Sequence, residues 1–332
     1  MAESSIVIVT YNGLLEHTIP CLESIFRGTG DEDYEVIAVD NNSSDGTPAY
    51  LTELAGREPR LKCVLNATNR GFAGGNNDGI RVATGRVIVL LNNDTRVSDG
   101  WLSRMRSTLL ADRSVGLVGP VSNAVGNEQK IFISGATPED ILGEGRTWAE
   151  MSGGDSFETD RLGFFCVAFR RDLLELVGLL DDAYDLGFYE DDDYCLRVLK
   201  AGYKLVCRED VFIYHHGSAS FGKVPHRTKD LLKKNRRLLE QKFGIRYNPR
   251  HPRDRQLDLA ENCLLGALTT PQQVSALTSR GKNRLQIART LMPRSWLKRL
   301  LFLRRLRFLE RRIAALQPPC NSYVFEDKEK LL

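Results

Sequence analysis

Four short apolar runs in the first hundred residues, each followed directly by polar side chains, constrain the fold of this chain most strongly. They occupy residues 5–9, 34–40, 61–66 and 86–91. Stretches with helical spacing or helix-cap residues separate them. Strand runs that alternate with helices indicate βαβ units, and continuous apolar runs are typical of buried parallel strands. We therefore predict an α/β fold with a mostly parallel central sheet and helices on both of its faces.

The polar residues after these runs predict a binding site. They lie at positions 10–12, 40–42, 66–75 and 92–94. Ligands of open α/β sheets bind outside the carboxyl ends of the strands. A single polar strand end is explained by a turn, whereas four at one edge of a sheet indicate a functional site.

The overall composition excludes several classes of protein. The chain has 332 residues, of which 42% are hydrophobic and 27% charged, as in an ordinary globular protein, and its net charge of +3 does not indicate nucleic-acid binding. The seven cysteines are scattered without a C-x-x-C pair, which argues against disulfide scaffolds and zinc ribbons. We see no signal peptide and no apolar run long enough to span a bilayer, so we expect a cytoplasmic protein.

The second half of the chain is organised differently. We expect a strand near 116–123, glycine-rich loops over 127–148, a strand leading into a helix over 161–178, and a helix over 190–202. The sequence becomes basic and helical beyond a boundary near Pro225. We therefore divide the chain into a first domain, residues 1–224, and a basic helical C-terminal extension, residues 225–332.

An acidic cluster opens the helix expected near residue 190. Glu190 and three aspartates follow one another directly after the sequence GFY. Carboxylates in the first turn of a helix are stabilised by the helix dipole, which explains one or two acids but not four. Adjacent like charges raise one another's pKa, and such clusters favour catalytic or metal sites.

Two further segments carry polar groups that suit a site. The adjacent histidines His215 and His216 end an apolar run, and a strand would point them to opposite faces. Histidine is a common metal ligand, although a histidine at a strand end is more often a hydrogen-bonded loop residue. The glycines of NRGFAGGNNDG, residues 69–79, allow close approach of backbone to a ligand, or simply form a flexible loop before a helix.

Six segments in this order resemble a family 2 glycosyltransferase with the GT-A fold. They are SIVIVTYNG, VDNNSSDGT, NRGFAGGNNDG, LLNNDT, FYEDDDYCLR and YHHGSASF, and the resemblance covers residues 4–222. The chain is most similar to the rhamnosyltransferase-like branch that builds bacterial surface polysaccharides. The resemblance implies a Rossmann-like GT-A domain over 1–224, with a nucleotide-binding half at about 1–100 and an acceptor half at about 101–224.

The resemblance also implies roles for individual residues. Asp191 matches the catalytic base, with Glu190 as the second choice. LLNNDT matches the D-x-D metal motif, so Asp94, Asn92 and His215 would hold the metal, His216 being the weaker alternative to His215. The residues implied in nucleotide binding are Thr10, Tyr11, Asn12, Asp40, Asn42, Asn69, Arg70, Gly71, Phe72, Gly74, Asn76, Asn77 and Asn93.

These residue types suit sugar transfer from a nucleotide-diphosphate donor, dTDP-rhamnose or a UDP-sugar. A divalent ion, Mg²⁺ or Mn²⁺, neutralises charge on the diphosphate, and magnesium often needs only one or two carboxylates. A carboxylate takes the proton of the acceptor hydroxyl, on a saccharide or a lipid-linked saccharide. A single displacement inverts the anomeric carbon. Alternative functions are a sugar nucleotidyltransferase and a non-catalytic membrane-associated protein that retains the fold.

The C-terminal extension contains a basic amphipathic helix. Apolar residues recur there at helical spacing, with arginines off the stripe. The pattern predicts peripheral contact with an anionic membrane through about residues 290–316, or a helix packed on the protein with its arginines in water. The stripe consists of Phe302, Leu306, Leu309, Ile313 and Leu316.

Overall fold

The computed structural model describes residues 2–30, 32–217, 225–266 and 270–316, except for the side chains of 225–228. These residues form two compact units, Met1–His251 and Pro252–Leu332. The first unit includes helix α8, Pro225–Phe243, which the sequence places after the expected domain boundary.

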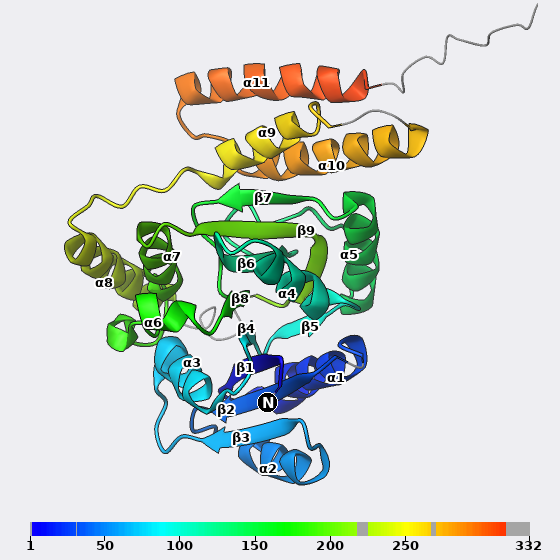
Figure 1. Cartoon of the computed structure of the whole chain (residues 1–332). Helices are drawn as coiled ribbons and strands as arrows, with labels where there is room; N and C mark the ends of the chain where they lie inside the picture. Colours follow the sequence, from blue (N-terminus) through cyan, green and yellow to red (C-terminus); the bar gives the residue numbers. More distant parts are fainter. Residues whose placement is uncertain (1, 31, 218–224, 267–269, 317–332) are drawn as a thin grey trace, which may run out of the picture. The chain divides into compact units, whose positions relative to one another are not determined.

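The amino-terminal half of the sheet is parallel, as predicted. Its strands are β1 (Ser4–Thr10), β2 (Tyr34–Asp40), β3 (Leu61–Leu65) and β4 (Val87–Asn92), in the order β3-β2-β1-β4 (Figure 1). The register places Thr10 beside Asp40 and Val9 beside Asn92. The polar strand ends therefore meet at one edge of the sheet.

Beyond β4 the sheet is mixed. The order continues β8-β6-β9-β5, and β7 also pairs with β9. β8 runs antiparallel to both of its neighbours, so the sheet is less parallel as a whole than expected, while the α/β fold class is confirmed. The strand bounds are β5 (Thr95–Val97), β6 (Val115–Val121), β7 (Ser156–Thr159), β8 (Cys166–Arg170) and β9 (Lys204–His215).

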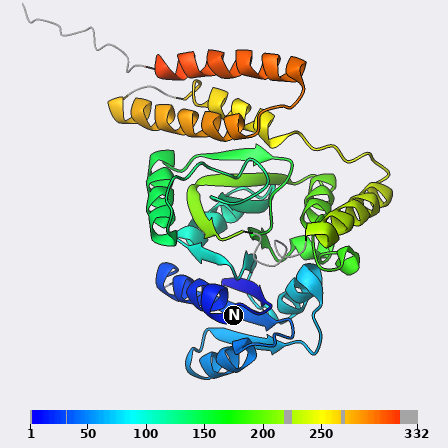
Figure 2. The same ribbon diagram turned by 180° about the vertical axis from the view of Figure 1, so that it is seen from behind.

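Helices cover both faces of the sheet and bury two apolar cores. Ile6 and Ile8 of β1 point into one core with α1, α2 and α4, and Val7 points into the other with α3, α5, α6 and α7. α1 and α3 lie on opposite sides of β1 in both views (Figures 1 and 2). The helix bounds are α1 (Ile19–Gly28), α2 (Thr47–Arg57), α3 (Gly71–Val82), α4 (Trp101–Ala111), α5 (Pro138–Ser152), α6 (Leu173–Val177) and α7 (Glu190–Lys200).

Two expectations for local structure are wrong. Residues 138–152 form helix α5 instead of loops, because Thr137 and Asp140 make a capping box that offsets the glycine content. Position 145 of this helix requires glycine, because a Cβ there would stand 2.0 Å from the ring of Phe212. Helix α3 begins at Gly71, so the glycines of the segment 69–79 belong to a helix and not to a flexible loop before one.

The second unit contains three helices, α9 (Pro252–Asn262), α10 (Pro271–Thr290) and α11 (Trp296–Ala314). The predicted stripe of α11 is buried against α9 and α10 through Phe302, Leu306, Leu309 and Ile313. Within the described residues, no helix is long and apolar enough to cross a membrane.

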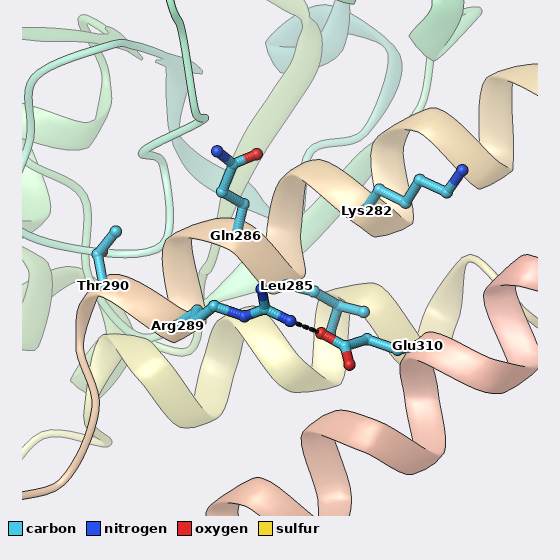
Figure 3. Close-up of a pocket in the computed structure, with 6 residues that line it drawn as sticks. All are labelled: Lys282, Leu285, Gln286, Arg289, Thr290 and Glu310. Atoms are coloured by element: carbon cyan, nitrogen blue, oxygen red, sulfur yellow. Dashed lines mark hydrogen bonds and ion pairs between the residues drawn. The ribbon is translucent and has the colours of Figure 1, made fainter.

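An open groove of about 570 Å³ lies within the second unit (Figure 3). An ion pair between α10 and α11, Arg289 with Glu310, spans it. Its lining contains none of the residues predicted for the site. The lining residues are Lys282, Leu285, Gln286, Arg289, Thr290 and Glu310.

Candidate active site

The turns after β1 and β2 form one hydrogen-bonded unit. The Asp40 carboxylate accepts hydrogen bonds from the Thr10 hydroxyl at 3.0 Å and from the backbone N–H of Ser43 at 2.8 Å. Asn12 and Asn42 both have left-handed backbone conformations, with φ of 57° and 65°, which asparagine tolerates. Tyr11 is 50% exposed between them. The two turns are thus rigid and present an aromatic ring to a ligand.

The next predicted segment joins the strand edge to the first turns of α3. The Asn69 side chain accepts from the N–H of Gly71 at 2.8 Å, and Arg70 pairs with Asp78 at 3.2 Å. Asn76 donates to the carbonyl of Phe72 at 2.9 Å. Gly74 faces the side chain of Arg70, and a Cβ there would lie 2.9 Å from it.

Asn77 and Gly71 hold α3 against the segment that precedes α7. Asn77 is buried, and its amide exchanges two hydrogen bonds with the backbone of Leu180, at 2.8 and 3.0 Å. Gly71 has a φ of 67°, and a Cβ there would stand 2.1 Å from the carbonyl oxygen of Asp185. These contacts bring the segment before the acidic helix beside helix α3.

Asp94 and His215 meet, although 120 residues separate them in the sequence. β5 and β9 pair antiparallel with Thr95 opposite His215, which places Nε2 of His215 3.2 Å from Oδ1 of Asp94. Nδ1 of His215 donates to the carbonyl of Ala124 at 2.6 Å, and Phe165 stacks on the ring. The ring orientation is therefore fixed, with Nε2 directed at the carboxylate.

The two side chains stabilise each other's charge. Burial would raise the pKa of Asp94, but hydrogen bonding and the charge of His215 outweigh it and hold this pKa below its ordinary value. Burial would lower the pKa of His215, but Asp94 outweighs it and raises this pKa. When His215 carries a proton on Nε2, the 3.2 Å contact is a charge-assisted hydrogen bond. A divalent cation is an alternative bridge, since the Ala124 carbonyl fixes the tautomer whose Nε2 lone pair faces Asp94.

Asn93 and the second histidine make contacts outside the Asp94–His215 pair. The Asn93 side chain donates to the Thr18 hydroxyl at 3.3 Å, and the ring of His216 lies 5.1 Å from that of His17. His17 carries no signal in the sequence that marks it as a site residue. Asn92 ends β4 and is partly exposed. Residues 218–221 of the YHHGSASF segment lie outside the described residues.

The donor set suits an oxygen-preferring divalent ion with few protein ligands. The described residues contain no group of three His, Cys, Asp or Glu side chains that could hold a metal ion. Asp94 and His215 supply two donors within 3.2 Å of each other, and Asn92 is the last residue of the neighbouring strand β4. Magnesium and manganese sites in phosphate-binding enzymes are often completed by substrate oxygens and water. The residues present therefore fit such an ion.

The four acids at the start of α7 have different environments. Asp193 is fully buried and is neutralised by Arg197 at 2.8 Å and Lys242 at 2.6 Å. Glu190 is also buried, and one of its carboxyl oxygens has no hydrogen-bond partner. Burial, followed by the charge of Asp191, raises the pKa of Glu190 well above its ordinary value. Asp193 thus serves the fold, and the surroundings of Glu190 disfavour its charged form.

Asp191 and Asp192 are partly exposed, and both have raised pKa values. Burial and the charge of Asp192 raise the pKa of Asp191 to about 7. Asp191 accepts a hydrogen bond from the backbone N–H of Asp192 at 2.9 Å. A carboxylate whose pKa lies near neutrality is well suited to accept a proton at physiological pH.

Helix α8 contributes residues that the sequence did not predict for this region. Asn235 donates from one amide nitrogen to the carbonyls of Tyr184, Gly187 and Phe188. The Tyr247 hydroxyl donates to Asp192 at 2.5 Å. The sequence contained no sign of the Asn235 contacts, because α8 is basic and mostly exposed and its polar residues resemble those of any solvated helix. Tyr247 lies in the segment after α8 and was not predicted either.

Comparison with known proteins shows the family to which the chain is related. The family described as glycosyl transferase family 2 matches residues 5–176. Glycosyltransferase AglE of Haloferax volcanii is 27% identical over 80% of this chain and 82% of its own length. The GalNAc(5)-diNAcBac-PP-undecaprenol beta-1,3-glucosyltransferase of Campylobacter jejuni is 28% identical over 53% of this chain and 54% of its own length.

A solved structure supports the fold. The mannosyltransferase PcManGT of Pyrobaculum calidifontis, in complex with GDP-Man and Mn²⁺, matches with a TM-score of 0.51 at 20% identity, over 95% of this chain and 85% of that one. The predicted GT-A fold is thereby confirmed. The chain spans between 25% and 82% of the length of the first curated relatives that it matches.

Proposed function

Because the chain belongs to glycosyl transferase family 2, we propose that it transfers a sugar from a nucleotide-diphosphate donor to the hydroxyl of a saccharide or lipid-linked acceptor. The observation that carries the proposal is the Asp94–His215 pair, whose Oδ1 and Nε2 atoms are 3.2 Å apart. Asp94 follows the end of β4. The pair lies at the carboxyl end of the strands, where ligands of such sheets bind. A diphosphate bound there would need its charge neutralised.

The donor nucleotide would occupy the edge formed by the turns after β1 and β2 and the start of α3. The exposed ring of Tyr11 offers a stacking surface to a base, and Asp40 would accept from the base. The other predicted nucleotide residues remain candidates, with Asn77 acting through its bonds to Leu180. We propose dTDP-rhamnose or a UDP-sugar as donor.

Asp94 and His215, with Asn92 as a third donor, would hold Mg²⁺ or Mn²⁺. The bound ion would neutralise the negative charge that develops on the diphosphate leaving group. The mannosyltransferase with a similar fold binds Mn²⁺, which supports this choice of metal.

Asp191 would act as the general base. Its pKa of about 7 leaves a large fraction ionised at neutral pH and able to take the proton from an acceptor hydroxyl. A single attack of that hydroxyl on the anomeric carbon breaks the bond to the diphosphate and inverts the carbon. Glu190 is buried where its charged form is disfavoured, and Asp193 is ion-paired to Arg197 and Lys242. Both are therefore less suited than Asp191 to serve as base.

The names of the relatives support a role in glycoconjugate or polysaccharide synthesis. The Campylobacter enzyme is named for an undecaprenol-diphosphate-linked saccharide, and a succinoglycan biosynthesis protein of Rhizobium meliloti is 34% identical over 30% of this chain. We propose an acceptor of this class for the present chain.

The function is tested by incubating the full-length protein with a panel of sugar nucleotides and measuring the released product. Release of nucleoside diphosphate, with Mn²⁺ and not with EDTA, is the expected result. A second incubation supplies a nucleoside triphosphate together with a sugar phosphate. Release of pyrophosphate in that incubation would identify a sugar nucleotidyltransferase instead. Binding without turnover for every donor, with and without a saccharide acceptor, would favour a non-catalytic protein.

We also propose that α11 contacts an anionic membrane surface, through a face other than the predicted stripe. The stripe is buried within the second unit, but five large apolar residues of the helix are 52–76% exposed. Exposed basic residues lie among them, including Arg304, Arg307 and Arg311. Apolar side chains interleaved with cations match the interface of an anionic leaflet. The exposed apolar residues are Trp296, Leu297, Leu300, Leu301 and Phe308.

Co-sedimentation with vesicles tests this contact. Substituting Trp296, Leu300 and Leu301 together by serine should abolish pelleting with phosphatidylglycerol-containing vesicles without disturbing the buried stripe. Leu265→Ser, at a position that is 81% exposed in the same unit, is the matched control. Equal pelleting of the triple variant and the wild type, or equal binding to neutral vesicles, would contradict the proposal.

A further inference from the structure

The acidic turn of α7 is contacted by residues from α8 and the segment after it. Tyr247 is 9% exposed, and its hydroxyl donates to Oδ1 of Asp192 at 2.5 Å. Its ring also packs edge-on against Tyr189, the residue that precedes α7, at a centroid distance of 6.1 Å. One side chain thus contacts both the ring of the residue that precedes the helix and one of the carboxylates of the helix.

The position of Tyr247 is itself fixed by α8. The backbone N–H of Tyr247 donates to Glu240 at 3.0 Å, and its carbonyl accepts from Arg236. Leu239 of α8 is fully buried in the same small apolar cluster as Tyr247. The segment from α8 to Tyr247 is therefore held as one piece with the acidic turn.

The backbone before α7 needs such support. Asp185, Phe188 and Tyr189 all have positive φ values, between 60° and 74°, in a conformation that side-chain-bearing residues rarely adopt. Asn235, fully buried, donates to three carbonyls of this stretch at 2.8–3.1 Å. Backbone strain of this kind persists where the surrounding structure over-determines it, and it clusters at active sites.

We propose that Tyr247 is a positioning residue for the carboxylate pair Asp191–Asp192, delivered to it by α8. The inference rests on the proposed function, in which Asp191 is the base. The Tyr247 hydroxyl fixes Asp192, whose N–H in turn donates to Asp191, so the orientation and ionisation of Asp191 depend on a residue outside the predicted catalytic domain. A hydrogen bond to a carboxylate favours its ionised form.

Several charged groups act on this pair besides Tyr247. The positive charge of Arg161 lowers the pKa of Asp192, and the negative charge of Asp160 raises it. Asp191 is the direct neighbour of Asp192. Because the two carboxylates are coupled, their ionisation is observed as a property of the pair. Tyr247 is the group whose hydroxyl can be removed without changing any of these charges.

Turnover of Tyr247→Phe in the full-length protein tests the inference. We expect kcat to fall about tenfold with donor KM within twofold. The midpoint of the pH–rate profile should move downward by about half a unit or more, because Asp192 without its hydrogen bond is less ionised and raises the pKa of Asp191 less. Tyr50→Phe, which removes a hydroxyl from a partly buried tyrosine of α2, should change neither value. An unchanged pH midpoint in Tyr247→Phe would overturn the proposal, because loss of folded protein alone lowers the amount of enzyme without moving it.

A double-mutant comparison tests the route through Asp192. In an Asp192→Asn background, Tyr247→Phe should change kcat less than twofold, since its partner is already neutral. An equal effect in both backgrounds would show that Tyr247 acts elsewhere.

A third measurement separates this inference from the proposed function. If the wild type turns over no donor, the proposed function fails, while a carboxyl ¹³C NMR titration still reports the ionisation of the pair. The titration midpoint of Asp192 should be higher in Tyr247→Phe than in the wild type, and that of Asp191 should be lower. Identical midpoints would overturn the inference by itself.

Discussion

Replacing Asp191 by asparagine should abolish turnover and, at alkaline pH, stabilise the protein. The two side chains have the same shape, and the asparagine oxygen can still accept the bond from the N–H of Asp192. The variant lacks only the ability to carry a charge and to take a proton. We expect kcat to fall by about 10²–10⁴, with donor affinity within twofold of the wild type.

The stability effect follows from the pKa of Asp191. The fold raises this pKa from 3.8 to about 7, and each unit corresponds to about 1.4 kcal/mol. Ionised Asp191 therefore destabilises the folded state by at most about 4 kcal/mol, and we expect about 2 kcal/mol because water reaches part of the carboxyl group.

The sign of the pH dependence is fixed. A carboxyl whose folded pKa is raised favours folding below its unfolded pKa of about 4, and this stability is lost as the pH rises through about 7. Wild type and Asp191→Asn should therefore be equally stable near pH 4, and the variant should be more stable at pH 8. The rate of the wild type should rise with pH through the same midpoint.

Tryptophan fluorescence during urea unfolding provides the assay. Trp101 and Trp148 are both buried in the cores of the first unit, so their emission reports the unit that contains Asp191. A variant that is less stable than the wild type at pH 8, or a wild-type rate that is flat between pH 6 and 8, would refute the assignment of Asp191.

Three further predictions concern other parts of the site. Asp94→Ala should remove activity and its dependence on divalent metal together, as measured by nucleoside diphosphate release over a Mn²⁺ series; a wild type that is fully active in EDTA would contradict the metal assignment. His215→Gln, which keeps a polar side chain without the imidazole, should raise the Mn²⁺ concentration needed for half-maximal rate, and an unchanged requirement would exclude this histidine as a ligand. Asn77→Ala should lower the free energy of unfolding by about 1–3 kcal/mol, because the backbone of Leu180 loses two buried partners; an unchanged urea midpoint would show that these bonds do not stabilise the fold.

Local pattern was sufficient to predict the parallel half of the sheet. The strand Tyr34–Asp40 was predicted with its observed bounds, because burial on both faces requires a continuous apolar run. The meeting of polar strand ends followed from the direction of parallel strands. Helix α5 was missed because glycine content was given more weight than the capping box at Thr137, and the close approach of Phe212 that explains Gly145 is a tertiary contact.

The residue types of the site were visible in the sequence, but their environments were not. Apart from the family resemblance, nothing in the sequence distinguishes the four adjacent acids from one another. In the fold, Asp193 is an ion-paired structural residue, whereas the pKa of Asp191 is about 7. That difference depends on Arg197 and on Lys242, which reaches the cluster from α8. Similarly, Asp94 and His215 were candidates from their motifs, whereas the pairing of β5 with β9 brings them within 3.2 Å.

Hydrophobic periodicity and residue type were enough to predict the four parallel strands, their order along the chain and the polar residues at their ends. Which carboxylate is poised to accept a proton depends on tertiary contacts, since a pKa is set by burial and by neighbours that lie far away along the chain. For the same reason, only the structure connects α8 and Tyr247 with the acidic helix, which the change in composition near Pro225 had separated.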